Sequence, residues 1–279
     1  MRNLNTMTME AKGDAIVPQL DCYDLGQGVT AFSTTRYGGY SEGSYGQFNI
    51  NAYCGDDAAA VSRNREALCR LLGIDDTKLL MPHQVHGTEV TVVDEAFMRL
   101  PATARRERLE GVDALMTDVA GVCIGVSTAD CIPLLLYDEA HHACCAIHAG
   151  WRGTVARIAQ KAVSCMTEVY GSDAAALRAQ IGPGISLESF EVGDEVYEAF
   201  AAAGFDMAPI SRRFPASDSR SRWHIDLPAC NRQQLLSAGL RPSQVACSSA
   251  CTFQQPERYF SARRLGIRSG RIFTAIIIR

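Results

Sequence analysis

The sequence lacks the features of secreted and membrane proteins. It has no apolar run of the roughly eighteen residues that a membrane-spanning helix needs. Its first residues, MRNLNTMTMEAKGD, have no apolar secretory core. We therefore expect a cytoplasmic protein that does not bind membranes. Residues 1–13 are polar and without pattern, and we expect them to form a loose terminus.

The chain also lacks paired cysteines and an excess of basic residues. Its eleven cysteines are an odd number without a CxxC pair, which argues against a disulfide framework and a zinc ribbon. The 27 Lys and Arg against 31 Asp and Glu give a net charge of −4, so nucleic acid is not an expected partner. With 47% hydrophobic residues among 279, the chain can bury a large core. We expect a single domain. Its oligomeric state, monomer or dimer, stays open.

One stretch organises the sequence. Residues 132–137 are apolar, 138–142 are polar and 143–147 are apolar again, which predicts a β-hairpin with a five-residue connection. Cys131 at the start of this hairpin would then meet His148 at its end. A thiolate beside an imidazole can form part of a zinc site or a Cys/His nucleophilic pair. The residue types alone leave both readings open, together with a purely structural role.

The remaining patterns alternate between strands and helices. Asp56 or Asp57 can cap a first segment with helical periodicity. A second such segment follows Gly153, and we expect its helix to end at Gly171. Residues 99–110 and 210–223 are charged without a clear period, so we expect loops there. The other expected strands are 29–33, 89–94, 113–117, 122–127, 179–182 and 272–278. Besides the helix after Gly153, we expect helices at 58–72 and 226–239 and a helix that residues 190–193 open and that runs to about residue 203.

Further candidate site residues lie near turns that contain glycine. His86 precedes Gly87 at the entrance of a strand and is a candidate third ligand, although His83 competes for that role. Arg36 in a glycine-rich segment and Arg152 before a helix N-terminus are candidates for binding an anion. A second arginine group can bind phosphate or form a solvated basic face; it consists of Arg263, Arg264, Arg268 and Arg271.

Taken together, the motifs resemble those of the YfiH/laccase-domain family. They occur in the family's order over residues 32–270: FSTTRYGG at 32–39, FNI at 48–50, QVHG at 84–87, TADCIP at 128–133, HAGWRG at 148–153, IGPGI at 181–185, FEVG at 190–193 and FSARR at 260–264. The resemblance implies an α+β fold of YfiH-like type, with mixed β-sheets sandwiched and flanked by helices. Ala262, Phe190 and Ser189 depart from the family's pattern.

The resemblance also implies a site and an activity. It places a mononuclear zinc on His86, Cys131 and His148, and the three departures leave these positions intact. Two imidazoles and one thiolate leave a fourth position open, as in catalytic zinc sites. Asp130 would join Cys131 and His148 as a catalytic residue, either moving a proton or only orienting the site. The expected substrate-binding residues are Arg36, Asn49, Arg152, Arg263 and Arg264.

The expected function is that of a zinc-dependent purine nucleoside enzyme. Such an enzyme would phosphorolyse adenosine, inosine and methylthioadenosine and deaminate adenosine, so a purine nucleoside and phosphate are the expected partners. The alternatives are a metal-independent Cys/His hydrolase or amidase that edits peptidoglycan precursors and a copper-dependent polyphenol oxidase, because copper also accepts two histidines and a cysteine. A non-catalytic binding protein is the least favoured hypothesis.

Overall fold

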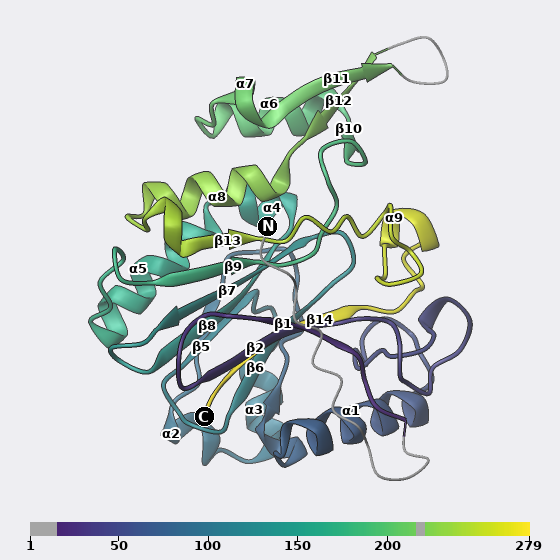
Figure 1. The fold of residues 1–279 in the computed structure, drawn as a ribbon, viewed down its shortest axis with the longest axis vertical. Helices are drawn as coiled ribbons and strands as arrows, with labels where there is room; N and C mark the ends of the chain where they lie inside the picture. Colours follow the sequence, from purple (N-terminus) through teal and green to yellow (C-terminus); the bar gives the residue numbers. More distant parts are fainter. Residues whose placement is uncertain (1–15, 216–220) are drawn as a thin grey trace.

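Two large mixed β-sheets form the centre of the molecule (Figure 1). The computed structural model describes residues 16–215 and 221–279, so the loose terminus predicted for residues 1–13 lies outside the described residues. In spatial order, the five-stranded sheet consists of β1 (Leu20–Tyr23), β2 (Val29–Thr34), β14 (Ile272–Ile278), β6 (Cys123–Thr128) and β3 (Leu79–Leu80). The six-stranded sheet consists of β13 (Val245–Cys247), β9 (Arg178–Ile181), β7 (Ile132–Asp138), β8 (Ala143–Ala149), β5 (Ala114–Thr117) and β4 (Val90–Val92).

The two large sheets pack face to face. Leu135 and Tyr137 of β7 point between the sheets, where they join Ile124 and Ile276 of the other sheet in one buried cluster. The alternate residues of β7 point to the opposite face, toward the helices. A strand that is buried on both faces reads as a continuous apolar run rather than as an alternating one, which explains the IPLLLY segment.

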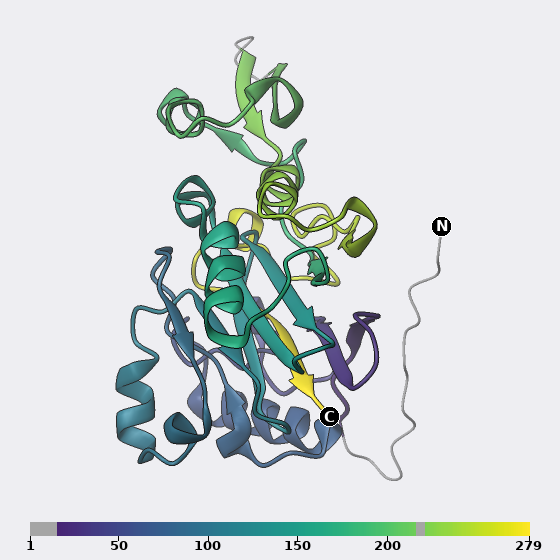
Figure 2. The same ribbon diagram turned by 90° about the vertical axis from the view of Figure 1, so that its left-hand side faces the viewer.

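Helices cover both outer faces of this pair of sheets. On the five-stranded sheet, Leu68 and Leu72 of α1 pack against Phe32 and Phe273. On the six-stranded sheet, α5 and α8 cover the face formed by alternate residues of β7, β8 and β9. The order helix, sheet, sheet, helix confirms the predicted α+β fold with sandwiched sheets flanked by helices (Figures 1 and 2). The helices are α1 (Ala58–Leu72), α2 (Glu95–Met98), α3 (Ala102–Arg108), α4 (Trp151–Val155), α5 (Ile158–Tyr170), α6 (Asp194–Ala202), α7 (Met207–Ile210), α8 (Leu227–Ser237) and α9 (Ala262–Leu265).

Three local predictions were wrong. The single helix expected after Gly153 is divided into α4 and α5, because Arg157 adopts a left-handed backbone with φ of 64°. Its guanidinium lies 3.6 Å from the centre of the Phe205 ring and donates to the carbonyl of Ala203, a tertiary interaction that periodicity does not reveal. The expected loop 99–110 contains α3, which is too short for its period to be recognised.

The expected loop 210–223 contains strands instead. β11 (Ser211–Pro215) and β12 (Ser221–Ile225) pair with β10 (Glu191–Val192) in a small sheet that projects from the body together with α6 and α7 (Figure 2). These strands carry arginines rather than an apolar face, and the Trp223 ring stacks on Tyr197 of α6 at 3.9 Å. Tertiary pairing thus outweighs the polar composition of this segment.

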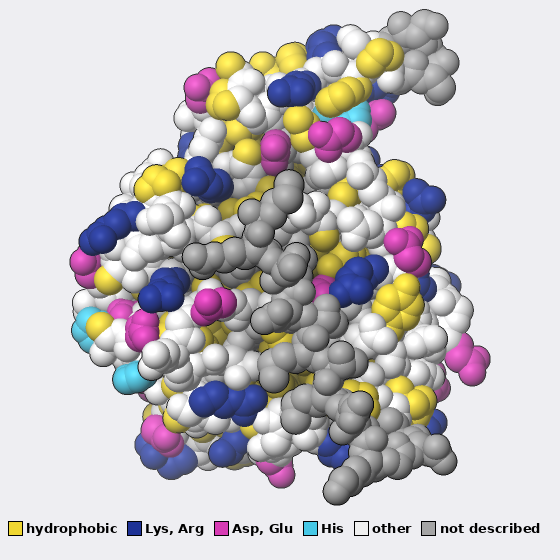
Figure 3. Space-filling model, in the orientation of Figure 1, with side chains coloured by type: hydrophobic (Ala, Val, Ile, Leu, Met, Phe, Trp, Pro, Cys, Tyr) yellow, Lys and Arg dark blue, Asp and Glu magenta, His cyan; other side chains and the backbone are white. Residues whose placement is uncertain are grey.

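The distribution of surface charge and the state of the cysteines agree with what the composition predicts. Acidic and basic side chains are interspersed over the face shown in Figure 3. All eleven thiols are free. Cys69, Cys123, Cys144 and Cys145 are buried, and Cys22 and Cys165 are half-buried against the core. Among the described residues, we find no helix that is both long and apolar enough to span a membrane.

Candidate metal centre

His86, Cys131 and His148 meet at one end of the β7–β8 hairpin. In the register of this hairpin Pro133 lies opposite His148, which brings Cys131 at the start of one strand to the end of the other, as the sequence predicts. The candidate ligand atoms of the three residues all lie within 4.8 Å of one another. Within residues 16–215 and 221–279, this is the one group of three or more His, Cys, Asp or Glu side chains with that geometry. The structure thus brings the three expected ligands together.

A buried carboxylate lies behind the two histidines. Asp113, at the start of β5, is fully buried, and its Oδ1 accepts a hydrogen bond from His148 Nδ1 at 2.7 Å. The backbone N–H of His148 donates to the carbonyl of the same Asp113 at 2.8 Å. Because Nδ1 of His148 is occupied in this way, Nε2 remains as the ligand atom. An outer carboxylate of this kind fixes the tautomer and the orientation of a metal-binding histidine.

The same carboxylate holds the turn that carries His86. Asp113 accepts hydrogen bonds from the backbone N–H groups of His86 at 3.0 Å and Gly87 at 2.7 Å, with a longer one from Val85 at 3.3 Å. His86 has a left-handed backbone with φ of 64°, a conformation that costs a non-glycine residue free energy. The hydrogen bonds from these N–H groups to Asp113 stabilise the left-handed backbone of His86. One side chain therefore positions two of the three candidate ligands.

The electrostatics of the cluster favour an ionised thiol. Burial opposes ionisation of Cys131, but His148 and His86 outweigh it and lower the pKa of the thiol to about 6. Burial likewise opposes protonation of His148, but the Cys131 thiolate and Asp113 raise the pKa of the imidazole to about 9. Without a metal, the pair is therefore a thiolate beside an imidazolium. The thiolate is the form of cysteine that binds metals and attacks electrophiles.

Two glycines of the HAGWRG motif allow the close packing around the cluster. A Cβ atom on Gly150 would lie 2.9 Å from Cδ2 of His86 and 3.1 Å from the Cys131 sulfur. A Cβ atom on Gly153 would lie 2.9 Å from the carbonyl oxygen of Gly87. Any larger residue at position 150 would displace the ligands, so the spacing of this motif has a steric reason.

The cluster opens into a cavity of about 260 Å³. His148 is buried, Cys131 is half-buried and His86 is exposed, so the exposure of the three candidate ligands that line the cavity increases from His148 to His86. Gln84, which also lines the cavity, makes two hydrogen bonds to the backbone of Ser127. Its amide nitrogen donates to the carbonyl of Ser127 at 2.8 Å, and its amide oxygen accepts from the N–H of Ser127 at 2.7 Å. The other lining residues are Asn51, Tyr53, Cys54, Pro82, His83, Thr128, Ala129, Ala262, Ile267 and Arg271.

Asp130 does not line this cavity, and its carboxylate connects two neighbouring segments through hydrogen bonds. Its two carboxylate oxygens accept from Thr252 Oγ1 and from the backbone N–H of Arg263, both at 2.7 Å. Its backbone is left-handed, with φ of 89°. The side chain of Arg263 donates to the carbonyl of Glu191 at 3.0 Å, and that of Arg264 donates to the carbonyl of Phe253 at 3.4 Å.

The other predicted substrate-binding residues also lie outside the cavity lining. Arg36 donates through Nε to the carbonyl of Gly46 at 2.8 Å and through Nη1 to the carbonyl of Pro256. Arg152 lies 4.3 Å from the centre of the Trp151 ring. Asn49 is buried, where its side chain donates to Asp56 at 2.8 Å and accepts from the N–H of Arg271 at 3.1 Å. None of these residues lines the cavity, and their roles stay predictions.

The sequence reading missed Asp113 as a site residue and expected only a strand at that position. The sequence does contain a sign of this role, because the Asp113 carboxylate immediately precedes a strand whose residues are all buried. A charged group that is buried in this way needs hydrogen-bonding partners. Arg271 appeared only as one member of an arginine group. It is the member of that group that lines the cavity, and its guanidinium donates to the carbonyls of Ile267, Ser269 and Gly270.

A sequence model of the family described as multi-copper polyphenol oxidoreductase laccase matches residues 30–279. The chain belongs to this family. The predicted resemblance to YfiH/laccase-domain proteins is thereby confirmed. All three candidate ligands and Asp113 lie within the matched residues.

Two of the chain's relatives carry nucleoside-related names. The chain is 46% identical over 250 residues to a purine nucleoside phosphorylase of Bacteroides thetaiotaomicron, which covers 90% of this chain and 92% of the relative. It is 44% identical over 258 residues to adenosine deaminase RL5 of an unknown prokaryotic organism, with coverage of 92% and 97%. The crystal structure of YlmD from Geobacillus stearothermophilus superimposes with a TM-score of 0.85 at 29% identity, covering 96% of this chain and 98% of that one.

Proposed function

We propose that this protein is a cytoplasmic, zinc-dependent purine nucleoside enzyme. The proposed reactions are phosphorolysis of adenosine, inosine and methylthioadenosine, and deamination of adenosine. The observation that carries the proposal is the convergence of His86, Cys131 and His148 within 4.8 Å on the wall of a cavity. The names of the relatives, a purine nucleoside phosphorylase and an adenosine deaminase, support the choice of substrate class.

The donor set fits zinc. Zinc accepts imidazole nitrogens and thiolates in tetrahedral sites, and three protein ligands leave one position for water or substrate. The lowered pKa of Cys131 provides the thiolate at neutral pH, and Asp113 fixes the histidine tautomer that leaves Nε2 free. A zinc ion held there would supply Lewis-acid chemistry, either by activating water near neutral pH or by polarising a bond of the substrate.

The residues of the chain itself account for orientation and access. Asp113 holds the ring of His148 and the turn of His86, so neither ligand has to reorganise when metal or substrate binds. Gly150 permits the turn before α4 to close over the ligands. The exposed side of His86 faces the cavity, which is where a nucleoside would enter.

Further roles in the proposal belong to residues that lie outside the cavity lining. Arg36, Arg152, Arg263 and Arg264 stay candidates for binding phosphate, with Asn49 supporting the cavity wall through its bond to the Arg271 backbone. Asp130 accepts two hydrogen bonds and links the TADCIP loop to α9. We propose that Asp130 acts by positioning Cys131 in that loop.

The decisive experiment combines metal analysis with an activity assay. Protein purified without added metal should contain zinc and should release ribose 1-phosphate from inosine only when phosphate is present. Cys131→Ala should abolish turnover and leave the circular dichroism spectrum unchanged, because the thiol lies at the end of a large core. Cys247→Ala removes an exposed thiol away from the site and serves as the matched control. A fully active Cys131→Ala protein would overturn the proposal.

A Cys/His hydrolase or amidase acting on peptidoglycan precursors is the second candidate. It is favoured by the Cys131 thiolate beside the His148 imidazolium, which is the arrangement of a nucleophile and its base. This candidate predicts that metal-free protein keeps its activity and that an electrophile labels Cys131. Loss of activity on metal removal, restored by zinc but not by copper, would argue against both the hydrolase and the copper oxidase readings.

A further inference from the structure

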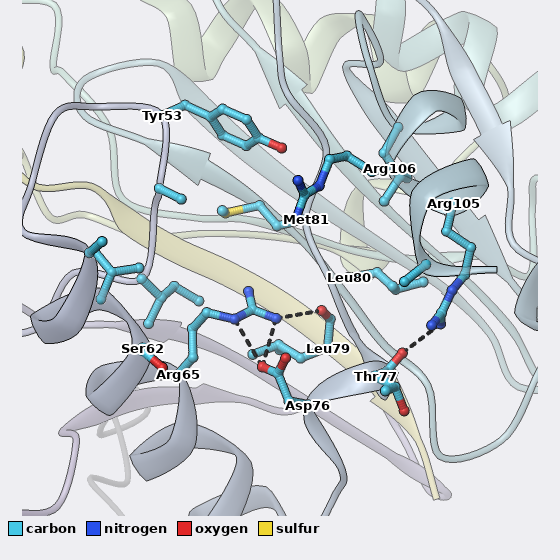
Figure 4. A pocket seen from close by; sticks show the side chains of 16 residues that line it. Tyr53, Ser62, Arg65, Asp76, Thr77, Leu79, Leu80, Met81, Arg105 and Arg106 are labelled. Carbon is cyan, nitrogen blue, oxygen red and sulfur yellow. Dashed lines mark hydrogen bonds and ion pairs between the residues drawn. The ribbon is translucent and has the colours of Figure 1, made fainter.

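A second cavity lies beside the metal site and has no role in the chemistry described above. Its volume is about 410 Å³, and Tyr53 lines both cavities (Figure 4). The Tyr53 ring stacks on His83 at 4.2 Å, and His83 in turn pairs with Glu110. Tyr53 is therefore held in place as a wall between the two cavities.

The floor of the second cavity is apolar and its rim is basic. Leu79 and Leu80 are buried beneath it, with Met81 beside them. Three arginines line it, Arg65 from α1 and Arg105 and Arg106 from α3, against one carboxylate, Asp76. Arg65 is paired with Asp76 at 2.8 Å and also donates to the carbonyl of Leu79 at 3.1 Å. That pair is neutral overall, so Arg105 and Arg106 have no carboxylate partner among the residues that line the cavity.

Two of the three arginines of α3, those that line this cavity, have unused capacity for hydrogen bonds to the protein. Arg105 donates through Nη1 to the carbonyl of Thr77 at 2.9 Å, but its Nε is buried without a partner in the described part of the chain. Arg106 makes no side-chain hydrogen bond or ion pair with any described residue. In Figure 4 its side chain extends toward the space between Tyr53 and Met81, next to the wall shared with the metal site. Arg106 is exposed, so water solvates its guanidinium in the free protein, and an anionic ligand would replace that water with charge-assisted hydrogen bonds.

We propose that this second cavity binds a phosphate group at Arg106, next to a nucleoside in the metal-site cavity. The nucleoside part of this inference rests on the proposed function. A cavity of about 260 Å³ has room for a nucleoside but little more, whereas the adjoining 410 Å³ accepts a further group across Tyr53. Guanidinium groups are the side chains best suited to bind phosphate oxygens. The phosphate belongs either to a nucleoside 5′-phosphate or to free inorganic phosphate.

The test is equilibrium binding of adenosine, adenosine 5′-phosphate and inorganic phosphate, measured by calorimetry on the full chain. Arg106→Ala should weaken binding of one phosphate-bearing ligand by about tenfold or more, the loss expected for one charge-assisted contact, and leave adenosine binding unchanged. Arg106→Lys, which keeps the charge, should restore part of the affinity. Arg108→Ala is the matched control, because Arg108 is exposed on the same helix and lines a different hollow.

The outcomes separate the two sources and the two proposals. A selective loss for adenosine 5′-phosphate identifies a nucleotide site, and a selective loss for inorganic phosphate identifies a site for the free anion. If Arg106→Ala changes neither affinity, or if Arg108→Ala changes them equally, the inference is wrong. Because binding is measured without turnover, a protein that binds the phosphate ligand but cleaves no nucleoside would refute the proposed function and leave this site standing.

Discussion

At the scale of single residues, Asp113 determines the geometry of the candidate site. Its carboxylate accepts from the imidazole of His148 and from the backbone of the turn that carries His86, and hydrogen bonds from these groups lower the pKa of Asp113 against the effect of burial. A side chain with this many partners orients ligands without binding the metal itself. Its contribution should therefore appear in metal affinity more than in the identity of the metal.

We predict that Asp113→Asn weakens zinc binding by about ten- to a hundredfold, the usual cost of losing an outer carboxylate partner. The amide keeps the shape of the side chain but replaces one acceptor oxygen with a donor, which opposes either His148 Nδ1–H or the N–H groups of the turn. Competition with a chromophoric chelator measures the affinity. Asp118→Asn changes an exposed carboxylate just after the same strand and should have no effect. Equal zinc affinity in wild type and Asp113→Asn would contradict the positioning role.

At the scale of elements, the β7–β8 hairpin connects sequence pattern to site. Its connection is closed by Asp138, which is 1% exposed and accepts from the N–H of Ala140 at 3.0 Å and from Nδ1 of His141 at 2.8 Å. Burial raises the pKa of Asp138, but the neighbouring Ser172 hydroxyl and the hydrogen bonds from His141 outweigh it and hold the pKa below its usual range. The stabilisation is then present above the unfolded pKa, near 3.9, and is lost as the pH falls through the folded value.

Asp138→Asn should accordingly lower the free energy of unfolding by about 1–2 kcal/mol at pH 7, and the difference from wild type should shrink below about pH 4. Urea unfolding at pH 7 and at pH 3.5 measures both quantities. Glu139→Gln is the control within the same turn, because the exposed Glu139 pairs with Arg178 at 3.3 Å and such pairs contribute less than about 1 kcal/mol. A difference that stays constant with pH would show that Asp138 does not act as a carboxylate.

The elements also show what sequence patterns could and could not predict. The hairpin, α1, α8 and the central strands were predicted because their apolar runs and caps are local signals, such as Asp57 accepting from Ala60 N–H at 2.8 Å. The pairing of β12 with β10 and the break at Arg157 depend on partners distant in the sequence, and the β11–β12 hairpin is polar and rich in arginine, so no apolar alternation reveals it. The same distinction applies to the site. The proximity of Cys131 and His148 could be predicted from the hairpin, whereas the choice of His86 depended on the family's motif and Asp113 was not predicted.

At the scale of the whole molecule, the candidate ligands join three separate parts of the chain. His86 lies between β3 and β4, Cys131 lies between β6 and β7, and His148 lies near the end of β8. β3 and β6 belong to the five-stranded sheet, whereas β4, β7 and β8 belong to the six-stranded one. A metal ion at this point would therefore connect the two sheets and stabilise the native state by mass action.

This linkage predicts that a chelator lowers the melting temperature of the wild-type protein. Zinc at a hundred times its Kd contributes about 2.7 kcal/mol, which corresponds to a shift of roughly 5 °C or more for a chain of this size. Cys131→Ala should show no such shift, since it has lost a ligand. Differential scanning fluorimetry with and without chelator measures the effect. A chelator effect of the same size in Cys131→Ala would place the metal elsewhere.

The most direct test of the account is the metal content of wild type and ligand variants, measured by mass spectrometry after purification without added metal. The account predicts about one zinc ion per chain in the wild type and a loss of zinc in His86→Ala, Cys131→Ala and His148→Ala. His83→Ala, which removes the neighbouring histidine stacked on Tyr53, should keep its zinc. An active wild-type protein without metal, or ligand variants that retain zinc, would contradict the central claim.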